Sequence, residues 1–247
     1  MKLAGKVALV TGAGRRVGRA IALACADAGA AVAVHYRSSA AGARQVVDAI
    51  RERGGEAESF AADLTAPEAA RGLADAVAAA FGGVDVLVNS AAAFVRGDFV
   101  GMDDAAWERA WRVSFETNLL APARLTRLCA QSLAARAGAV VNVLEVGATH
   151  AWPSYAHHTA AKAGLAHLTR TLAVALAPRV RVNGVSPGIA AFPPDMPEAE
   201  RAALVDKTLL GRPGTPDDVA AAVVFLAAHP YITGAIVPVD GGWSVPR

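Results

Sequence analysis

Three side chains have types that can exchange protons and a spacing that can bring them together: Glu145, His158 and Lys162. His158 and Lys162 are four residues apart in a helical pattern, so they lie on one helix face. Glu145 follows an apolar run typical of a strand, whose end would lie beside that helix. Imidazole has an ordinary pKa of about 6.5; a nearby carboxylate favours its protonated form and a nearby ammonium opposes it. We therefore predict that His158 donates a proton or a hydrogen bond to a substrate.

Other roles for the residues around His158 stay open. His158 can instead orient a substrate, or remain from an ancestral site in a protein without redox chemistry. Tyr155, one turn earlier, offers a hydroxyl on the same face, or forms part of the pocket wall or core. His150, His157 and His158 lack the spacing that would point two imidazoles at one ion, so we expect no metal site.

A glycine-rich turn follows the first predicted strand and opens a helix. It reads Thr11-Gly12-Ala13-Gly14-Arg15-Arg16-Val17-Gly18. Glycines let the backbone approach a pyrophosphate, and the free amides and dipole at the helix start attract its charge. Arg15 and Arg16 are disfavoured at a helix start unless an anion compensates them; the alternative is two solvated arginines. The turn predicts dinucleotide binding by Gly12, Arg15, Arg16 and Val17.

The end of the second predicted strand indicates which dinucleotide binds. NAD-binding folds often place a carboxylate there to accept the ribose hydroxyls, but this chain has Tyr36, Arg37 and Ser38. Arg37 can pair with a 2′-phosphate, assisted by Ser38 and Arg16. We predict NADPH/NADP+ rather than NADH as the cofactor.

Short apolar runs alternate with alanine-rich helical patterns along the whole chain. The runs are 7–10, 31–35, 84–88, 140–144, 180–185 and 235–239, with a weaker one at 58–62. Continuously apolar strands joined by helical crossovers predict a single-domain α/β Rossmann fold over 1–247, with a doubly wound parallel sheet of about seven strands. The stretch 186–197, with Pro187, Pro193, Pro194 and Pro197, is expected to be a substrate lid or a plain connector before a helix from Glu198.

Composition argues against several classes of partner. The 24 basic and 22 acidic residues give a formal charge of +2 and no basic footprint for nucleic acid or membrane lipid. Although 54% of residues are hydrophobic, no apolar stretch reaches the roughly 18 residues of a membrane span. We find no pattern of a secretion signal and expect a cytoplasmic protein whose Cys25 and Cys129 are reduced.

Taken in order, several motifs resemble those of the short-chain dehydrogenase/reductase family over nearly the full length. They are the glycine turn, Asp63-Leu64, Val88-Asn89-Ser90-Ala91, Asn118, Lys162, Arg181-Val182-Asn183-Gly184-Val185, Pro187-Gly188 and Val239-Asp240-Gly241-Gly242. The resemblance implies that Lys162 binds the nicotinamide ribose and that Asn118 holds a water in a proton relay. It also implies cofactor contacts at Asp63, Leu64, Asn89, Pro187 and Gly188. Helices over about 103–136 and 154–177 resemble the family's dimerisation surface, which implies a homo-oligomer, a tetramer by analogy.

Within that family the chain is most similar to the pteridine reductases. Arg16 stands where other members have the middle glycine, and 35–38, Phe94 and Tyr231-Ile232-Thr233-Gly234 resemble the same subgroup. The resemblance implies that Phe94 stacks on a flat pterin ring; the alternative is a phenylalanine of the core.

The catalytic motif departs from the family pattern at two positions. The family has a Ser and, thirteen residues later, Tyr-x-x-x-Lys; here Glu145 replaces the Ser and His158 the Tyr. A basic C=N nitrogen can be protonated before hydride arrives, which suits such a site. We predict an NADPH-dependent reductase of a small cyclic C=N or C=O compound, with a pterin-like or imine substrate preferred. The alternatives are an isomerase or cyclase with structural NADP, or a catalytically inactive NADP-binding protein.

Overall fold

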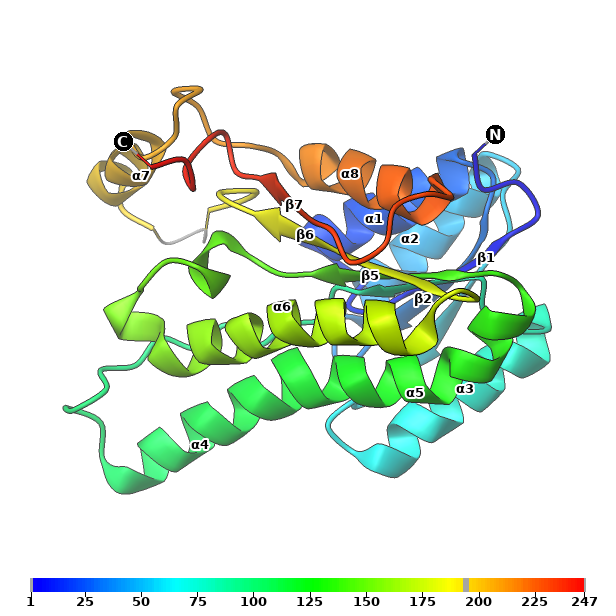
Figure 1. The fold of residues 1–247 in the computed structure, drawn as a ribbon, viewed down its shortest axis with the longest axis horizontal. Coiled ribbons are helices and arrows are strands. Elements are labelled where there is room, and N and C mark those ends of the chain that lie inside the picture. The colour runs from blue at the N-terminus through cyan, green and yellow to red at the C-terminus, as the bar shows by residue number, and fades with distance from the viewer. Residues whose placement is uncertain (1, 193–195, 247) are drawn as a thin grey trace.

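A single parallel sheet forms the centre of the computed structural model, which describes residues 2–192 and 196–246. Seven strands lie in the order β3-β2-β1-β4-β5-β6-β7 (Figure 1). Their bounds are β1 Val7–Val10, β2 Ala31–Tyr36, β3 Ala57–Ala61, β4 Val86–Asn89, β5 Ala139–Val143, β6 Arg181–Pro187 and β7 Ile236–Val239. Strands β1, β4 and β5 are buried along their whole length, which explains their mostly apolar sequences. The predicted seven-stranded parallel sheet is confirmed.

Helices cover both faces of the sheet. They are α1 Arg16–Asp27, α2 Ala40–Glu52, α3 Pro67–Phe81, α4 Asp104–Phe115, α5 Ala121–Ala135, α6 Ala156–Leu176, α7 Glu198–Val205 and α8 Pro216–Ala228. Helices α1, α2 and α8 pack their buried side chains into one apolar core, and α3, α5 and α6 enclose a second core on the opposite face (Figure 1). The doubly wound arrangement is therefore as predicted.

The chain changes its winding direction at β1. This strand pairs with β2 on one side and with β4 on the other, so the crossovers run to opposite halves of the sheet. In such folds the ligand crevice lies beyond the carboxyl ends of the two strands at this switch point. The glycine turn follows β1 and Ser90 follows β4, which places both at the crevice.

The helical region that the sequence suggested over 103–136 is interrupted. Helix α4 ends at Phe115, a π-helical turn spans Glu116–Leu120, and α5 begins at Ala121. Pro122 explains the break, because it has no N–H to donate to the carbonyl four residues earlier, at Asn118. Asn118 is the buried residue of the π turn, and such turns often occur at functional sites.

The segment ahead of α7 is only partly described. Helix α7 begins at Glu198, as the sequence predicted. Pro193 and Pro194 lie outside the described residues.

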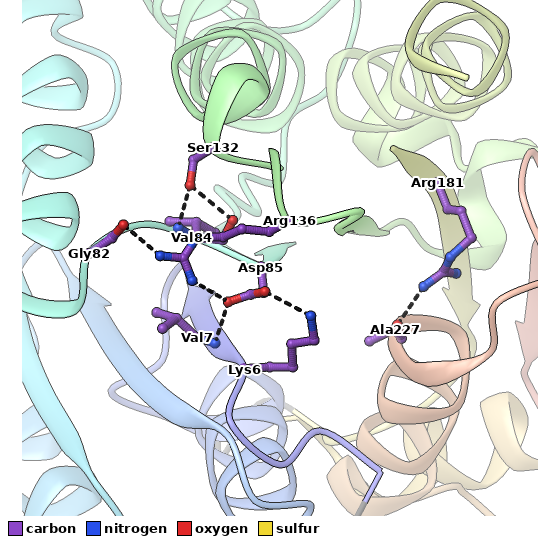
Figure 2. A network of polar contacts seen from close by, with 9 residues as sticks. All are labelled: Lys6, Val7, Gly82, Val84, Asp85, Ser132, Arg136, Arg181 and Ala227. Atoms are coloured by element: carbon purple, nitrogen blue, oxygen red, sulfur yellow. Dashed lines mark hydrogen bonds and ion pairs between the residues drawn. The ribbon is translucent and has the colours of Figure 1, made fainter. Parts of the chain in front are cut away.

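Asp85 lies where the central strand β4 begins, at the end of the strands opposite the crevice. Its side chain joins several segments of the chain there (Figure 2). Its buried carboxylate accepts hydrogen bonds from Lys6 Nζ at 3.0 Å, the Val7 amide at 3.0 Å and Arg136 Nη1 at 3.1 Å. The preceding residue, Val84, bonds through its N–H and C=O to the Ser132 hydroxyl (Figure 2). Strand β4 begins at Val86, two residues later than the sequence suggested.

We expect Asp85→Ala to lower the free energy of unfolding by about 2 kcal/mol, because the variant removes three bonds to a buried anion and leaves the Val7 amide without an acceptor. Urea denaturation measures the loss. Asp27→Ala is the matched control, since Asp27 and its partner Arg53 are both 58% exposed and such pairs contribute little. Equal losses in the two variants would contradict the role given to Asp85.

Candidate active site

Four predicted catalytic residues come together beyond the carboxyl ends of β4 and β5. Glu145 follows β5, His158 and Lys162 lie in the first turns of α6, and Asn118 lies in the π turn. His158 Nε2 is 2.8 Å from Glu145 Oε1, and His158 Nδ1 is 3.2 Å from Asn118 Nδ2. All but Glu145 are buried, and the Glu145 side chain is only 16% exposed. The structure therefore brings Glu145, His158 and Lys162 together, as their spacing suggested, and adds Asn118, 40 positions from His158, which the family resemblance had indicated.

The contacts of His158 define its protons. Nδ1 is 2.8 Å from the Ala93 carbonyl oxygen, which can only accept, so Nδ1 carries a hydrogen. Nε2 and Glu145 Oε1 approach to 2.8 Å, which two lone pairs can do only with a proton between them. The pair is thus either imidazolium with carboxylate or imidazole with carboxylic acid. Neither atom has a partner in good hydrogen-bond geometry, so this proton is held in a poorly aligned contact.

Asn118 holds the strand extension that follows β4. Its Oδ1 accepts from the Ala93 N–H at 2.9 Å, and its Nδ2 donates to the Ala93 carbonyl at 2.9 Å. His157, next to the catalytic position, contacts the Val95 carbonyl through Nε2 at 2.9 Å. Residues of α6 and the π turn together fix the backbone on both sides of Phe94.

Lys162 is buried beneath these groups. Its Nζ donates to the Val143 carbonyl at 2.7 Å. Burial lowers the pKa of Lys162, and the negative charge of Glu145 partly offsets that effect. An ammonium has three hydrogens, so two remain beyond the bond to Val143.

Phe94 and Tyr155 form an aromatic wall over His158. Their rings stack with centroids 4.4 Å apart and planes 21° apart. The His158 ring meets Phe94 edge-on at 4.8 Å. Phe94 is 52% exposed, so the alternative of a core phenylalanine is wrong.

The glycine turn has the close packing that a dinucleotide loop needs. Gly12 has a φ of +67°, and a Cβ there would lie 2.9 Å from Ala91 Cα. The Thr11 hydroxyl accepts from the amides of Ser90 and Ala91, both at 2.9 Å, and joins the turn to the end of β4. Helix α1 begins behind this turn without a side-chain cap. These features fit a pyrophosphate between the turn and the helix start.

Arg16 has a backbone conformation that favours glycine. Its φ is +49°, in the left-handed region that costs a non-glycine residue free energy. Its guanidinium reaches across to donate to the Ala191 carbonyl at 3.0 Å, beyond the end of β6. Arg15, the residue before α1, is exposed. This bond joins the glycine turn to the segment that follows β6.

The residues predicted to select the cofactor lie at the end of β2. Arg37 and Ser38 are exposed directly after Tyr36, the last residue of the strand. Asp63 is exposed at the end of β3; bonds from Thr65, together with the charge of Arg37, hold its pKa below the ordinary value. Leu64 beside it is buried.

Three further residues are predicted to bind the cofactor and lie at the ends of β4 and β6: Asn89, Pro187 and Gly188. Asn89 is buried and donates to Asn142 Oδ1 at 2.8 Å, so its side chain is engaged between β4 and β5 rather than turned toward the crevice. Pro187 ends β6, and Gly188 packs so closely that a Cβ would lie 2.9 Å from Asp240 Cα. The sequence pattern indicates no role for His35 or Ala93, although both bond to residues of the predicted site.

A family model described as enoyl-(acyl carrier protein) reductase matches residues 12–244. The chain belongs to the short-chain dehydrogenase/reductase family. An uncharacterised oxidoreductase of Methylorubrum extorquens is 39% identical, and a 3β-hydroxysteroid dehydrogenase of Eggerthella lenta is 37% identical. The alignments cover 98% of this chain in both cases, and 98% and 95% of the respective relatives.

A solved short-chain fold carries the cofactor itself. The crystal structure of a blue fluorescent protein from a metagenomic library, in complex with NADPH, has a TM-score of 0.91 and 31% identity. The match covers 99% of this chain and all of that one. The present short-chain family member is therefore an oxidoreductase that uses a nicotinamide dinucleotide.

The described residues contain neither a helix long and apolar enough to cross a membrane nor a group of three His, Cys, Asp or Glu side chains arranged for a metal ion. Cys25 and Cys129 are free and buried, and burial raises the pKa of each thiol to about 12.

Proposed function

We propose that the protein is an NADPH-dependent reductase of a small cyclic C=N or C=O compound, with a pterin-like or imine substrate preferred. The observation that carries this proposal is the Glu145–His158 contact, in which both facing atoms are buried and neither has a well-aligned hydrogen-bond partner. Buried polar atoms without partners cost free energy, and a substrate nitrogen or oxygen would relieve that cost.

The side chains divide the work as follows. Bound NADPH supplies a hydride. His158 gives the substrate a proton from Nε2, and Glu145 stabilises the ring in its protonated form. Lys162 offers its remaining ammonium hydrogens to the ribose of the cofactor, and Asn118 keeps Ala93, and with it His158, in position. Phe94 presents a ring face to a flat substrate.

The charge of Glu145 favours a C=N substrate over a neutral ketone. A protonated imine or ring nitrogen is a cation, and the Glu145 carboxylate, which is only 16% exposed, attracts it. Hydride addition to the adjacent carbon then neutralises that cation. An NADPH-oxidation screen over pterins, cyclic imines, quinones and ketones tests the proposal, with oxidation of cyclic C=N compounds as the expected result.

The same screen separates one other candidate. A His–Glu pair whose facing atoms are buried also suits isomerisation or cyclisation, with the dinucleotide retained as a structural group. That function predicts product formation without stoichiometric loss of NADPH absorbance. Absence of oxidation with every substrate, together with tight NADPH binding, supports an inactive binding protein instead.

We infer a preference for NADPH over NADH from Arg37, Ser38 and Arg16. Arg37→Ala should weaken NADPH binding about tenfold, the loss of one charge-assisted hydrogen bond, while leaving NADH binding unchanged. Fluorescence titration with both nucleotides measures the change. Arg71→Ala, at an exposed position on α3, is the control. Equal NADH and NADPH affinity in the unmodified protein would overturn the preference.

We also propose a cytoplasmic homotetramer. The free buried thiols fit a reducing compartment. Two apolar side chains are exposed on helices: Val113 on α4 and Val174 on α6. Their exposure fits burial against other subunits. Light scattering at several protein concentrations tests the assembly.

A further inference from the structure

His35 connects the glycine turn to the neighbouring strand. It is the second-last residue of β2, and its side chain is 1% exposed. Its Nδ1 accepts from the Gly12 amide at 3.1 Å, and its Nε2 is 3.1 Å from the Ala62 carbonyl oxygen at the end of β3. The His35 backbone carbonyl also accepts from the Ala13 amide at 2.8 Å. Two successive amides of the dinucleotide turn are therefore held by this one residue.

These two ring contacts permit a single tautomer. The Ala62 carbonyl can only accept, so Nε2 carries the hydrogen. The Gly12 amide can only donate, so Nδ1 must be bare. A second proton on the ring would set an N–H against the N–H of Gly12. The observed geometry therefore requires a neutral imidazole.

The surroundings of His35 favour that neutral form. Burial lowers the pKa of His35, and the Ala62 bond and the charge of Asp63 raise it by less. On the β3 side, Asp63 is the charged group that acts on the ring. The charge of Arg37 in turn lowers the pKa of Asp63. On the side of the glycine turn, the contacts are the backbone amides of Gly12 and Ala13.

We propose that His35 positions the dinucleotide turn and that a second proton on its ring weakens cofactor binding. Gly12 adopts a φ of +67° close to Ala91, and the amide that His35 holds fixes the peptide plane at this bend. Because this arrangement of the turn needs the bare Nδ1, a proton on that atom disturbs the turn that binds the cofactor. Affinity is full while the ring is neutral and falls as the pH drops through the pKa of His35. The inference depends on dinucleotide binding alone and not on the substrate proposed above.

Three variants test this role. His35→Gln keeps one acceptor and one donor but cannot titrate, whereas His35→Leu removes both bonds. His167→Gln makes the same change at an exposed histidine on α6. The dissociation constant of NADP+ is measured by calorimetry from pH 8 to pH 5, with circular dichroism at each pH to establish that the protein is folded.

The unmodified protein and His167→Gln should lose about fivefold more affinity on acidification than His35→Gln does. The 2′-phosphate of NADP+ titrates in the same range, so the difference between proteins, and not the slope of one, isolates His35. His35→Leu should bind weakly at every pH. An unaltered pH profile in His35→Gln overturns the proposal, as does wild-type affinity in His35→Leu. If His35→Leu does not fold, the profile of His35→Gln decides.

Discussion

Replacement of His158 by alanine should lower kcat by about 10²- to 10⁴-fold, the range that a positioned proton donor contributes. NADPH binding should be unchanged, because the contacts of His158 are to Ala93, Asn118, Glu145 and the ring of Phe94. Single-turnover measurement of NADPH oxidation, beside a binding titration, separates the two effects. Wild-type turnover in His158→Ala would remove this residue from the mechanism.

His158 also holds the backbone beside Phe94, so the loss needs a control for position. His157→Ala removes a similar bond, to the Val95 carbonyl, while leaving the contact with Glu145 intact. A loss of activity as large as that of His158→Ala would assign the effect to the displaced loop and not to the proton.

Glu145→Gln tests whether the pair acts as one unit. The variant keeps the shape of the side chain but cannot stabilise an imidazolium. If the two residues carry one proton together, the double variant should be hardly slower than either single variant.

His158→Tyr restores the family's phenol, and we expect it to gain ketone reduction.

Gly18→Ala should weaken NADPH binding about a hundredfold and lower the free energy of unfolding by about 2 kcal/mol. An alanine Cβ there would overlap the carbonyl oxygen of Gly12, a backbone atom that cannot turn away as a flexible side chain can. Helix α1 would have to move off the turn, and its amides would move with it. Binding titration and urea denaturation measure the two losses.

Gly72 provides the matched control for Gly18. It also lies within a helix, α3, but a Cβ there meets nothing within 4 Å. Gly72→Ala should therefore stabilise the protein by about 0.5 to 1 kcal/mol, since alanine loses less backbone entropy in a helix. Unchanged NADPH binding and a gain in stability in Gly18→Ala, as in Gly72→Ala, would show that the turn tolerates a side chain at position 18.

The sequence predicts the central strands well because β1, β4 and β5 are buried along their whole length and are mostly apolar, whereas the largely exposed β3 gives a weaker signal. It predicts the break between α4 and α5 less well. A helical pattern continues across Pro122, and only the missing N–H at that position indicates that the bond to Asn118 cannot form. Pro122, the cause of the break, is visible in the sequence. The π-helical form of the break depends on packing, which the sequence does not show directly.

The active site likewise has one part that the sequence predicts and another that it does not. The spacing of Glu145, His158 and Lys162 was enough to predict their convergence. The bonds that fix them run to the backbone carbonyls of Ala93 and Val143, and those of His35 run to Gly12 and Ala62. Every residue type has the same carbonyl and nearly every type the same amide, so such partners leave no trace in the amino-acid pattern.

The stacked pair of Phe94 and Tyr155 affects selectivity before any chemistry occurs. One face of the Phe94 ring is already covered by a phenol, so a flat substrate that takes this face exchanges one stacking partner for another. The net gain is the difference between two similar interactions, small for an aliphatic ring and larger for an electron-poor heterocycle. Tyr155 therefore competes with the substrate for the Phe94 ring, and it lowers the affinity for compounds that stack weakly.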